Sequence, residues 1–268
     1  MTELQVTTRD GVRLHTRSDG PQDGPVLVFA NSLGTTLAIW DAVLALLPEG
    51  LRVIRYDMRG HGGSDVPAAP YSMGQLVSDA EAVCDAHNVR DAMFVGLSVG
   101  GMVAQGLAIK RPDLVRAMVL SNTAAKIGNP ALWEDRIAAI RKSGMAAAAG
   151  EIMKRWFARG FHGTPAMTRW QDMVAATPIE GYCGVAAAIA GTDFYTPTSG
   201  LRIPTLGIAG TEDKSTPPDL VRETVDLIPG SQFALIRRSG HLPCVDQPTR
   251  YAGVLAQFIA DTDQLGVS

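Results

Sequence analysis

The feature that most limits the fold of this chain is a repeated alternation between short apolar runs and stretches with helical periodicity. The apolar runs are nearly continuous, which is typical of strands that are buried on both faces of a sheet. They are VLVFA (26–30), RVIRYD (52–57), AMFVGL (92–97), RAMVLSN (116–122), TLGIAG (205–210) and FALIRR (233–238). The helix-like stretches cover 36–47, 72–88, 99–110, 217–228 and 247–261. This order predicts an α/β protein with a mostly parallel central sheet and helices on both faces.

A different pattern precedes the first apolar run. VRLHTR (12–17) alternates apolar and polar residues, as a half-buried strand does. Asp10-Gly11 directly before it is a favourable pair for a tight turn. We therefore expect an antiparallel hairpin at the start of the sheet.

Residues 129–199 interrupt the alternation, because they contain helical stretches and no good strand run. The longest helical stretch is LWEDRIAAIRKSGMAAAAGEIMKRWF (132–157), and Pro, Gly and Thr separate it from those that follow. We expect a helical cap at 129–199, inserted into one core formed by 1–128 and 200–268. An independent all-helical domain is the alternative, and it is disfavoured because the sheet would then lose its last strands.

Composition and charge limit the classes of partner. The chain has 268 residues, of which 46% are hydrophobic and 19% charged, as in a globular protein with a large core. A formal net charge of −3 offers no basic surface to nucleic acid or an anionic membrane. No apolar run is long enough to span a bilayer, and MTELQVTTRD lacks the pattern of a secretory signal. We expect a cytoplasmic protein that binds neither nucleic acid nor a membrane; the sequence predicts no oligomeric state.

The sequence also predicts neither a metal nor a cofactor. The three cysteines, Cys84, Cys183 and Cys244, match neither a disulfide framework nor a zinc site, and we interpret each as a buried thiol. A P-loop sequence and a His-Glu-x-x-His zinc motif are both absent from the sequence. Gly100-Gly101 belongs to a helical stretch rather than to a dinucleotide-binding loop.

GLSVG (96–100) lies where the apolar run 92–97 meets the helical stretch 99–110. A Gly-x-Ser-x-Gly sequence between a strand and a helix is typical of a sharp turn that exposes a nucleophilic serine. Serine on such a turn is strained, and neighbours without a Cβ avoid a clash. The N-terminus of the following helix favours a developing anion at this point. We interpret Ser98 as a nucleophile, the alternative being an ordinary helix N-cap.

A serine hydroxyl needs a base to take its proton, and a histidine is the usual choice. His241 lies in RRSGHLPCVDQP, directly after the last apolar run, and we expect it to be the base. His61, in the Gly-rich turn RGHGGSD (59–65), is interpreted as a loop-forming residue. The acid that orients the base should follow a late strand, where GIAGTEDKSTPP offers both Glu212 and Asp213. The remaining histidines, His15, His87 and His162, are interpreted as structural or surface residues.

An oxyanion formed by attack of Ser98 needs two aimed hydrogen-bond donors. One is expected to be the backbone N–H of Val99, the residue after the nucleophile. The other is expected from NSLGT (31–35), the loop after the first apolar run, with the N–H of Leu33 best placed. Such donors are typically worth about a hundredfold or more in turnover.

Nearly the whole chain resembles the 3-oxoadipate enol-lactone hydrolases, a branch of the α/β-hydrolase superfamily. The motifs that carry the resemblance are Asn31-Ser32-Leu33-Gly34-Thr35, RYDMRGHGGSDVP (55–67), GLSVGGM (96–102), LSNTAAKIG (120–128), RWF (155–157), TPIEGYCG (177–184) and AGTEDKSTPP (209–218). The resemblance implies an α/β-hydrolase fold with an inserted cap. It also implies Ser98, Asp213 and His241 as a catalytic triad, with Leu33 and Val99 as oxyanion donors. Val99 departs from the methionine that is common in this branch, and IAGTDFYTP (189–197) departs from a usually more charged cap segment.

The implied reaction is hydrolysis of a small enol-lactone that carries a free carboxylate, as in aromatic catabolism. That carboxylate needs a cation or an amide cluster near the cap, and Lys126, Arg136 and Arg155 are candidates; for any single one of them, a solvent-exposed charge is the favoured interpretation. Trp133 is expected either to line the pocket or to pack inside the cap. A general carboxylesterase, or a lactonase for another ring, is the alternative activity with the same triad. A binding scaffold without catalysis is disfavoured, because all three triad residues are present.

Overall fold

Every apolar run forms a strand in the computed structural model, which describes residues 2–262. The strands are β1 (Thr2–Thr7), β2 (Arg13–Asp19), β3 (Val26–Ala30), β4 (Arg52–Tyr56), β5 (Ala92–Leu97), β6 (Val115–Ser121), β7 (Thr205–Gly210) and β8 (Gln232–Ile236). All residues of β4, β5 and β7 are buried, as expected for strands that are covered on both faces. The strands form one eight-stranded sheet with the order β1-β2-β4-β3-β5-β6-β7-β8.

The direction of the strands confirms a mostly parallel sheet. Only the β1–β2 and β2–β4 pairs are antiparallel, and the other neighbours run parallel. β1 and β2 form the expected opening hairpin, with Gly11 at a φ of +84° in its turn. The chain passes from β3 to β4 on one side and then returns to β5 on the other side of β3. The carboxyl ends of β3 and β5 therefore flank a topological switch point, where α/β proteins bind ligands.

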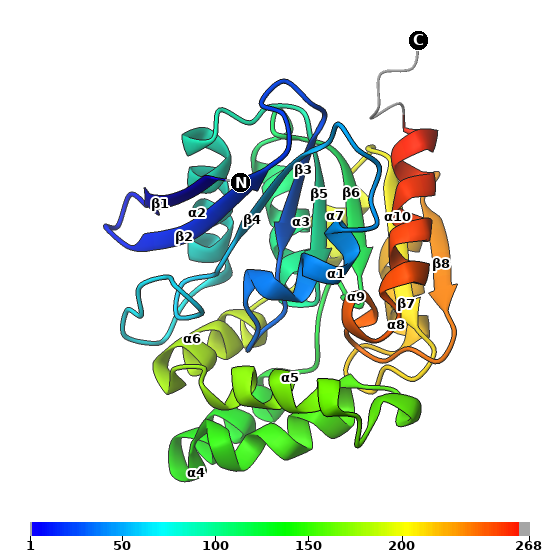
Figure 1. Ribbon diagram of the computed structural model, residues 1–268. Helices are drawn as coiled ribbons and strands as arrows, with labels where there is room; N and C mark the ends of the chain where they lie inside the picture. Colours follow the sequence, from blue (N-terminus) through cyan, green and yellow to red (C-terminus); the bar gives the residue numbers. More distant parts are fainter. Residues whose placement is uncertain (1, 263–268) are drawn as a thin grey trace.

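Helices cover both faces of the sheet (Figure 1). In the core they are η1 (Leu37–Trp40), α1 (Asp41–Leu44), α2 (Met73–Ala86), α3 (Val99–Lys110), α8 (Pro218–Asp226), α9 (Pro243–Asp246) and α10 (Pro248–Asp261). α1 and α10 pack together on the near face in Figure 1, and α2 and α3 lie behind the strands. The expected helix over 36–47 is shorter than predicted, because a 3₁₀ turn begins it and α1 ends at Leu44.

Three of the remaining helices, with a short 3₁₀ turn, form a layer beyond the carboxyl ends of the strands (Figure 1). They are α4 (Pro130–Trp156), η2 (Arg159–Phe161), α5 (Pro165–Ala175) and α6 (Ile179–Ala190), and they lie between β6 and β7 in the chain. α7 (Tyr195–Ser199) follows them before β7 and packs against α3 behind the sheet. α4 packs against both α5 and α6. Gly144, with φ +79° and ψ 166°, breaks α4 into two helical halves, whereas the sequence had suggested one continuous stretch.

Within residues 2–262, no single helix has the length and apolar character needed to cross a membrane. Among the helix pairs of this described range, α5 and α6 together meet those two criteria, and a bend of 88° separates them. Most residues of α6 are buried inside the protein.

Candidate active site

Ser98 lies in the sharp turn between β5 and α3, as the GLSVG sequence predicted. Its φ of +57° is in a region that side chains rarely adopt, so the turn holds it under strain. The flanking glycines permit this geometry. A Cβ on Gly96 would lie 2.2 Å from the carbonyl oxygen of Gly100, and a Cβ on Gly100 would lie 2.3 Å from that of Ala30. The close approach of these backbones explains why neither position carries a side chain.

His241 and Asp213 come together from the loops after β8 and β7. His241 Nδ1 lies 2.8 Å from Asp213 Oδ2, and both side chains are almost completely buried. A carboxylate at this distance fixes the imidazole with its proton on Nδ1 and leaves Nε2 available as a base. Glu212 points elsewhere, since its carboxylate accepts the backbone N–H of Arg159 at 2.9 Å. The geometry therefore places Asp213, the acid that the family resemblance implied, next to the base and Glu212 away from it.

The Asp213 carboxylate is fully satisfied by hydrogen bonds. Besides His241, it accepts the Asn122 side-chain amide at 2.9 Å, the backbone N–H of Ser215 at 2.7 Å, and both N–H and hydroxyl of Thr216 at 3.1 and 2.8 Å. Burial alone would raise the pKa of Asp213, but His241 and these donors outweigh it, so the net pKa lies below 3.8. Asp213 is therefore ionised at neutral pH, which an orienting carboxylate requires.

Hydrogen bonds to Asp246 and to the cap hold the loop that carries His241 in place. Asp246 accepts the Ser239 hydroxyl at 2.6 Å and the Gly240 N–H at 2.7 Å. The N–H of His241 itself donates to the carbonyl of Trp156, the last residue of α4. The cap and the histidine loop are thus joined by backbone hydrogen bonding next to the imidazole. Gly240 allows this approach, because a Cβ there would lie 2.0 Å from the same Trp156 oxygen.

Of the two predicted oxyanion donors, Leu33 lines the same cavity as Ser98, and Val99 follows Ser98 as the first residue of α3. Within residues 2–262, the backbone N–H groups of Leu33 and Val99 donate to no protein acceptor. Leu33 lies in the loop after β3, and Asn31 anchors that loop by donating to the Tyr56 carbonyl and accepting the Trp40 indole N–H, both at 2.8 Å. Two unsatisfied donors beside a strained serine are the arrangement that an oxyanion hole needs.

A cavity of about 270 Å³ connects these groups. Its lining residues are Ser32, Leu33, Ser98, Ile127, Gly128, Leu132, Trp133, Arg136, Arg155, Trp156, Tyr182, Ile189, Lys214, Ser215, Thr216 and His241. Between the described residues, no hydrogen bond joins the Ser98 hydroxyl to the His241 imidazole, although both open into this cavity. In enzymes without substrate such a bond is often long and tightens on binding.

Three of the four predicted substrate-binding residues line the cavity, namely Trp133, Arg136 and Arg155. Lys126 does not reach it and is a correction to the prediction. Its ammonium group forms an ion pair with Asp193 at 3.0 Å, and both side chains are about half exposed at the surface. The choice among three nearby cations depended on side-chain direction, which the sequence does not encode.

Two of the cations that line the cavity, Arg136 and Arg155, come from α4. Within residues 2–262, neither Arg136 nor Arg155 pairs with a carboxylate. Partial burial and the neighbouring Arg136 lower the pKa of Arg155 from its usual value, although it remains a cation at neutral pH. The Arg136 guanidinium lies 4.6 Å from the ring centre of Trp133, whose indole N–H donates to the Ile127 carbonyl at 2.7 Å. The pocket therefore holds two guanidinium groups that no ion pair within the described residues neutralises.

Sequence reasoning missed several residues of the site. Asn122 and Thr216 support Asp213, Trp156 and Tyr182 line the cavity from the cap, and Lys214 adds a cation at its edge. The motifs RWF and TPIEGYCG contain Trp156 and Tyr182, so a signal existed for the segments but not for the side chains. Among the described residues, no group of three or more His, Cys, Asp or Glu is arranged to hold a metal ion.

Fold and site together define an ester hydrolase of the α/β-hydrolase class, and residues 25–143 match the family described as alpha/beta hydrolase fold. The 3-oxoadipate enol-lactonase 2 of Acinetobacter baylyi is 34% identical over 91% of this chain and 92% of that protein. The enol-lactonase structure from Burkholderia xenovorans LB400 has a TM-score of 0.92 at 32% identity, covering 96% of this chain and all of the other. The chain belongs to the 3-oxoadipate enol-lactonase branch of this family.

A second similar structure is that of a thermophilic esterase from Thermogutta terrifontis, which was solved with malate bound. It has a TM-score of 0.89 and 27% identity, covering 98% of this chain and 99% of that one. Thus the family resemblance that the sequence motifs indicated is confirmed, and an esterase shares the architecture.

Proposed function

We propose that this chain hydrolyses a small enol-lactone with a free carboxylate, converting 3-oxoadipate enol-lactone to 3-oxoadipate in aromatic catabolism. The observation that carries the proposal is that Arg136 and Arg155, neither of which forms an ion pair within residues 2–262, line the cavity that also contains Ser98. A buried carboxylate is costly unless a cation or donors receive it, and these side chains supply both. The relatives named enol-lactonases support the same substrate.

In the proposed mechanism, Ser98 Oγ attacks the lactone carbonyl carbon and His241 Nε2 takes the hydroxyl proton. Asp213 stabilises the imidazolium, and the N–H groups of Leu33 and Val99 hold the oxyanion. The bond between the carbonyl carbon and the ring oxygen then breaks, and the ring oxygen takes the proton from His241. The enol that results tautomerises to the ketone. Water attacks the acyl-enzyme with His241 as base, which frees Ser98 and forms the second carboxylate.

The cavity volume of about 270 Å³ supports a small substrate, because it lies just below the usual range for drug-sized ligands. The reaction needs no further cofactor in this scheme. We expect the protein to act in the cytoplasm on a small molecule, and its buried free thiols Cys84, Cys183 and Cys244 are compatible with a reducing compartment.

A general esterase or lactonase of different ring specificity is the second candidate. The observation that favours it is the apolar part of the cavity wall, formed by Ile127, Leu132 and Ile189 with Trp133 and Trp156. Such a wall accepts acyl groups without a carboxylate. The similar esterase structure shows that this architecture serves ester substrates.

A side-by-side assay separates the two candidates. Purified protein is given the enol-lactone, an N-acyl homoserine lactone and p-nitrophenyl acetate at matched concentrations. The proposed function predicts that kcat/KM for the enol-lactone exceeds the others by about a hundredfold or more, since a charge-assisted contact is worth about 1.5–3 kcal/mol. Equal values across the three would favour the general esterase.

A further inference from the structure

The N–H of Leu33 and the carbonyl of Ser32 belong to the same peptide group. A peptide group is planar and trans, so its N–H and its carbonyl point in opposite directions. A contact that fixes the direction of the Ser32 carbonyl therefore also fixes the direction of the Leu33 N–H. In the proposed mechanism this N–H holds the oxyanion, so the partner of the carbonyl behind it bears on the reaction.

Thr35 is the partner of that carbonyl. Its hydroxyl donates to the Ser32 carbonyl at 2.7 Å, and its backbone N–H donates to the same oxygen at 3.2 Å. The hydroxyl bond is the shorter of the two and has the usual length of an O–H···O hydrogen bond. Thr35 is completely buried, and its β-branched side chain has restricted rotation about χ1. The hydroxyl is thus held on the side of the peptide group that lies opposite the Leu33 N–H.

The second donor peptide is held by another threonine. The N–H of Val99 shares its peptide group with the carbonyl of Ser98, and the Thr123 hydroxyl donates to this carbonyl at 2.6 Å. Thr123 is also completely buried, and a Cβ on Gly101 would lie 2.5 Å from its side chain, which explains the glycine at that position. The N–H groups of Gly101 and Met102 donate to the same oxygen at 2.9 and 3.3 Å. Thr123 therefore adds a third donor to a carbonyl that α3 already holds.

Hydrogen bonds to a carbonyl act on the N–H of the same peptide group in two ways. They restrict rotation of the peptide plane, so the N–H keeps its direction while the oxyanion forms. They also polarise the amide, which makes its N–H a stronger donor. Both effects favour charge that develops in the transition state, because a preorganised donor needs no reorientation at that moment. Their contribution should therefore appear in kcat and not in KM.

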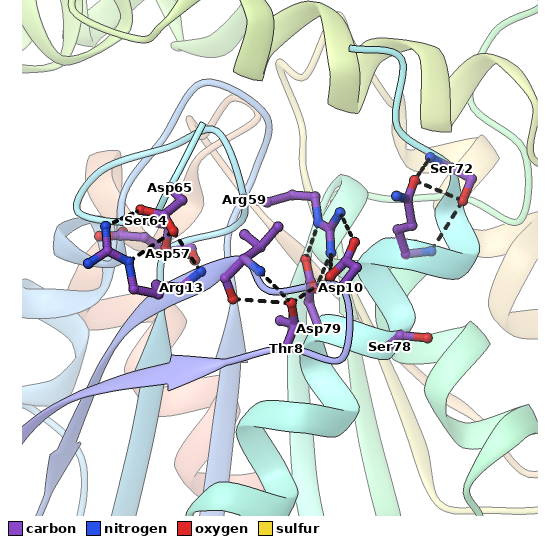
Figure 2. A network of polar contacts seen from close by, with 12 residues as sticks. Thr8, Asp10, Arg13, Asp57, Arg59, Ser64, Asp65, Ser72, Ser78 and Asp79 are labelled. Carbon is purple, nitrogen blue, oxygen red and sulfur yellow. Dashed lines mark hydrogen bonds and ion pairs between the residues drawn. The ribbon is translucent and has the colours of Figure 1, made fainter. Parts of the chain in front are cut away.

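Other contacts of the loop after β3 fix different parts of it. Asp57, labelled in Figure 2, holds the far end of the loop, since its carboxylate accepts the N–H of Leu37 at 2.7 Å and the N–H of Gly63 at 3.0 Å. This contact fixes the start of η1 and does not involve the donor peptide. Among the described residues, only Thr35 donates to the Ser32 carbonyl.

We propose that Thr35 and Thr123 are positioning residues for ester hydrolysis, each of which holds the carbonyl of one donor peptide so that the N–H of Leu33 or Val99 stays aimed at the oxyanion. This inference rests on the serine mechanism proposed above. Of the described residues that line the cavity, neither threonine is one, so each acts through a peptide group and not on the substrate.

Serine and alanine at position 35 isolate the hydroxyl, because both lack the γ-methyl group and differ only in the oxygen. With p-nitrophenyl acetate, we expect Thr35→Ala to lower kcat and kcat/KM by about five- to fiftyfold each, since one oxyanion donor is loosened rather than lost. KM then stays nearly unchanged. A boronic acid, which forms a tetrahedral adduct, should bind more weakly by a similar factor. Thr35→Ser should keep each value within about threefold of wild type.

The same two substitutions at Thr123 should give the same pattern. The loss in Thr123→Ala should be smaller, about three- to tenfold in kcat, because α3 still holds the Ser98 carbonyl. Thr192→Ala is the matched control. The buried Thr192 hydroxyl donates to the Ala188 carbonyl at 2.6 Å, and the peptide group of that carbonyl is not a donor to the oxyanion. This variant should change kcat by less than about twofold.

Wild-type kcat in either alanine variant would overturn the role of that threonine. Equal losses in Thr35→Ser and Thr35→Ala would also overturn it, because they would assign the effect to packing of the methyl group.

A crystal structure of the wild-type protein with the boronic acid bound to Ser98 covers the case in which an alanine variant does not fold. The N–H groups of Leu33 and Val99 should contact one boronate oxygen while both threonine hydroxyls keep their bonds to the carbonyls. A donor peptide turned away from the boronate, or a broken threonine bond, would overturn the proposal. Fluorophosphonate labelling of Ser98 tests the serine mechanism separately, since failure of the threonine role leaves that labelling possible.

Discussion

At the scale of single residues, Ser98 is the proposed nucleophile, and its backbone is strained, with a φ of +57°. Ser98→Ala should keep the fold and lower turnover by about 10³-fold or more. Ser98→Gly should be equally inactive but more stable than the alanine variant by about 1 kcal/mol, because glycine tolerates positive φ. Urea unfolding and turnover measure both effects. A tenth of wild-type turnover in either variant would contradict the serine mechanism.

Asp213 and Glu212 form a matched pair of acids on one loop. Asp213→Asn should lower turnover by about 10⁴-fold, because an amide facing Nδ1 favours the wrong imidazole tautomer. Glu212→Gln should change turnover less than about threefold, since the amide oxygen of the new side chain can still accept the Arg159 N–H. Steady-state kinetics of the two variants decide, and reversed effects would show that the orienting carboxylate is Glu212.

The sequence could place Ser98, Asp213 and His241 because each follows a strand that its apolar run identifies. Such positions depend only on the order of elements. Asn122 was not predictable, because its amide meets Asp213 from a neighbouring strand and the sequence does not say which polar side chains face each other. The prediction that Lys126 binds substrate was wrong for a related reason. An exposed side chain can point in many directions, and the ion pair with Asp193 selects one of them.

At the scale of elements, α4 carries Arg136 and Arg155 on opposite sides of the break at Gly144. Gly144→Ala should destabilise the protein by about 1 kcal/mol, because φ is +79° and a Cβ there meets no strain-relieving contact within 4 Å. It should also raise KM for the carboxylated lactone by moving the arginines apart.

Gly150→Ala is the control in the same helix, since Gly150 has no positive φ and open space around its Cα. This substitution should stabilise the protein by about 0.5–1 kcal/mol and leave KM unchanged. Thermal unfolding and KM together measure the pair. Equal stability of the two variants would mean that the break in α4 is not a fixed feature.

Strands were predicted more accurately than helix ends. The runs 26–30, 92–97 and 205–210 match β3, β5 and β7 residue for residue, because complete burial leaves a continuous apolar signal. The break in α4 was missed, since a glycine inside a helical pattern is equally compatible with a continuing helix. The expected helix over 36–47 ends early, at Leu44, and no glycine or proline at that point of the sequence marks the end.

At the scale of the whole molecule, Asp246 fastens the histidine loop that joins core and cap. Burial raises the pKa of Asp246 from 3.8 to about 6. Between about pH 4 and 6 the folded chain thus binds a proton that the unfolded chain has lost. This contribution to stability is complete below pH 4 and disappears as the pH rises through about 6.

Asp246→Asn removes this titration. The free energy of unfolding of the wild-type protein, minus that of the variant, should therefore fall between pH 4 and pH 7 by at most about 3 kcal/mol. Urea unfolding at several pH values measures the difference. A difference that does not change with pH, or one that increases with pH, would contradict the buried position of this carboxylate.

Recognition of a substrate carboxylate by Arg136 and Arg155 is the central claim, and one kinetic comparison tests it most directly. The measurement is kcat/KM for 3-oxoadipate enol-lactone and for its neutral methyl ester, in the wild-type protein and in Arg136→Gln, Arg155→Gln and Lys126→Gln. We predict a preference for the acid of about ten- to a hundredfold, lost largely in one or both arginine variants and retained in Lys126→Gln, whose cation lies outside the cavity. Equal values for acid and ester in the wild-type protein would contradict the account.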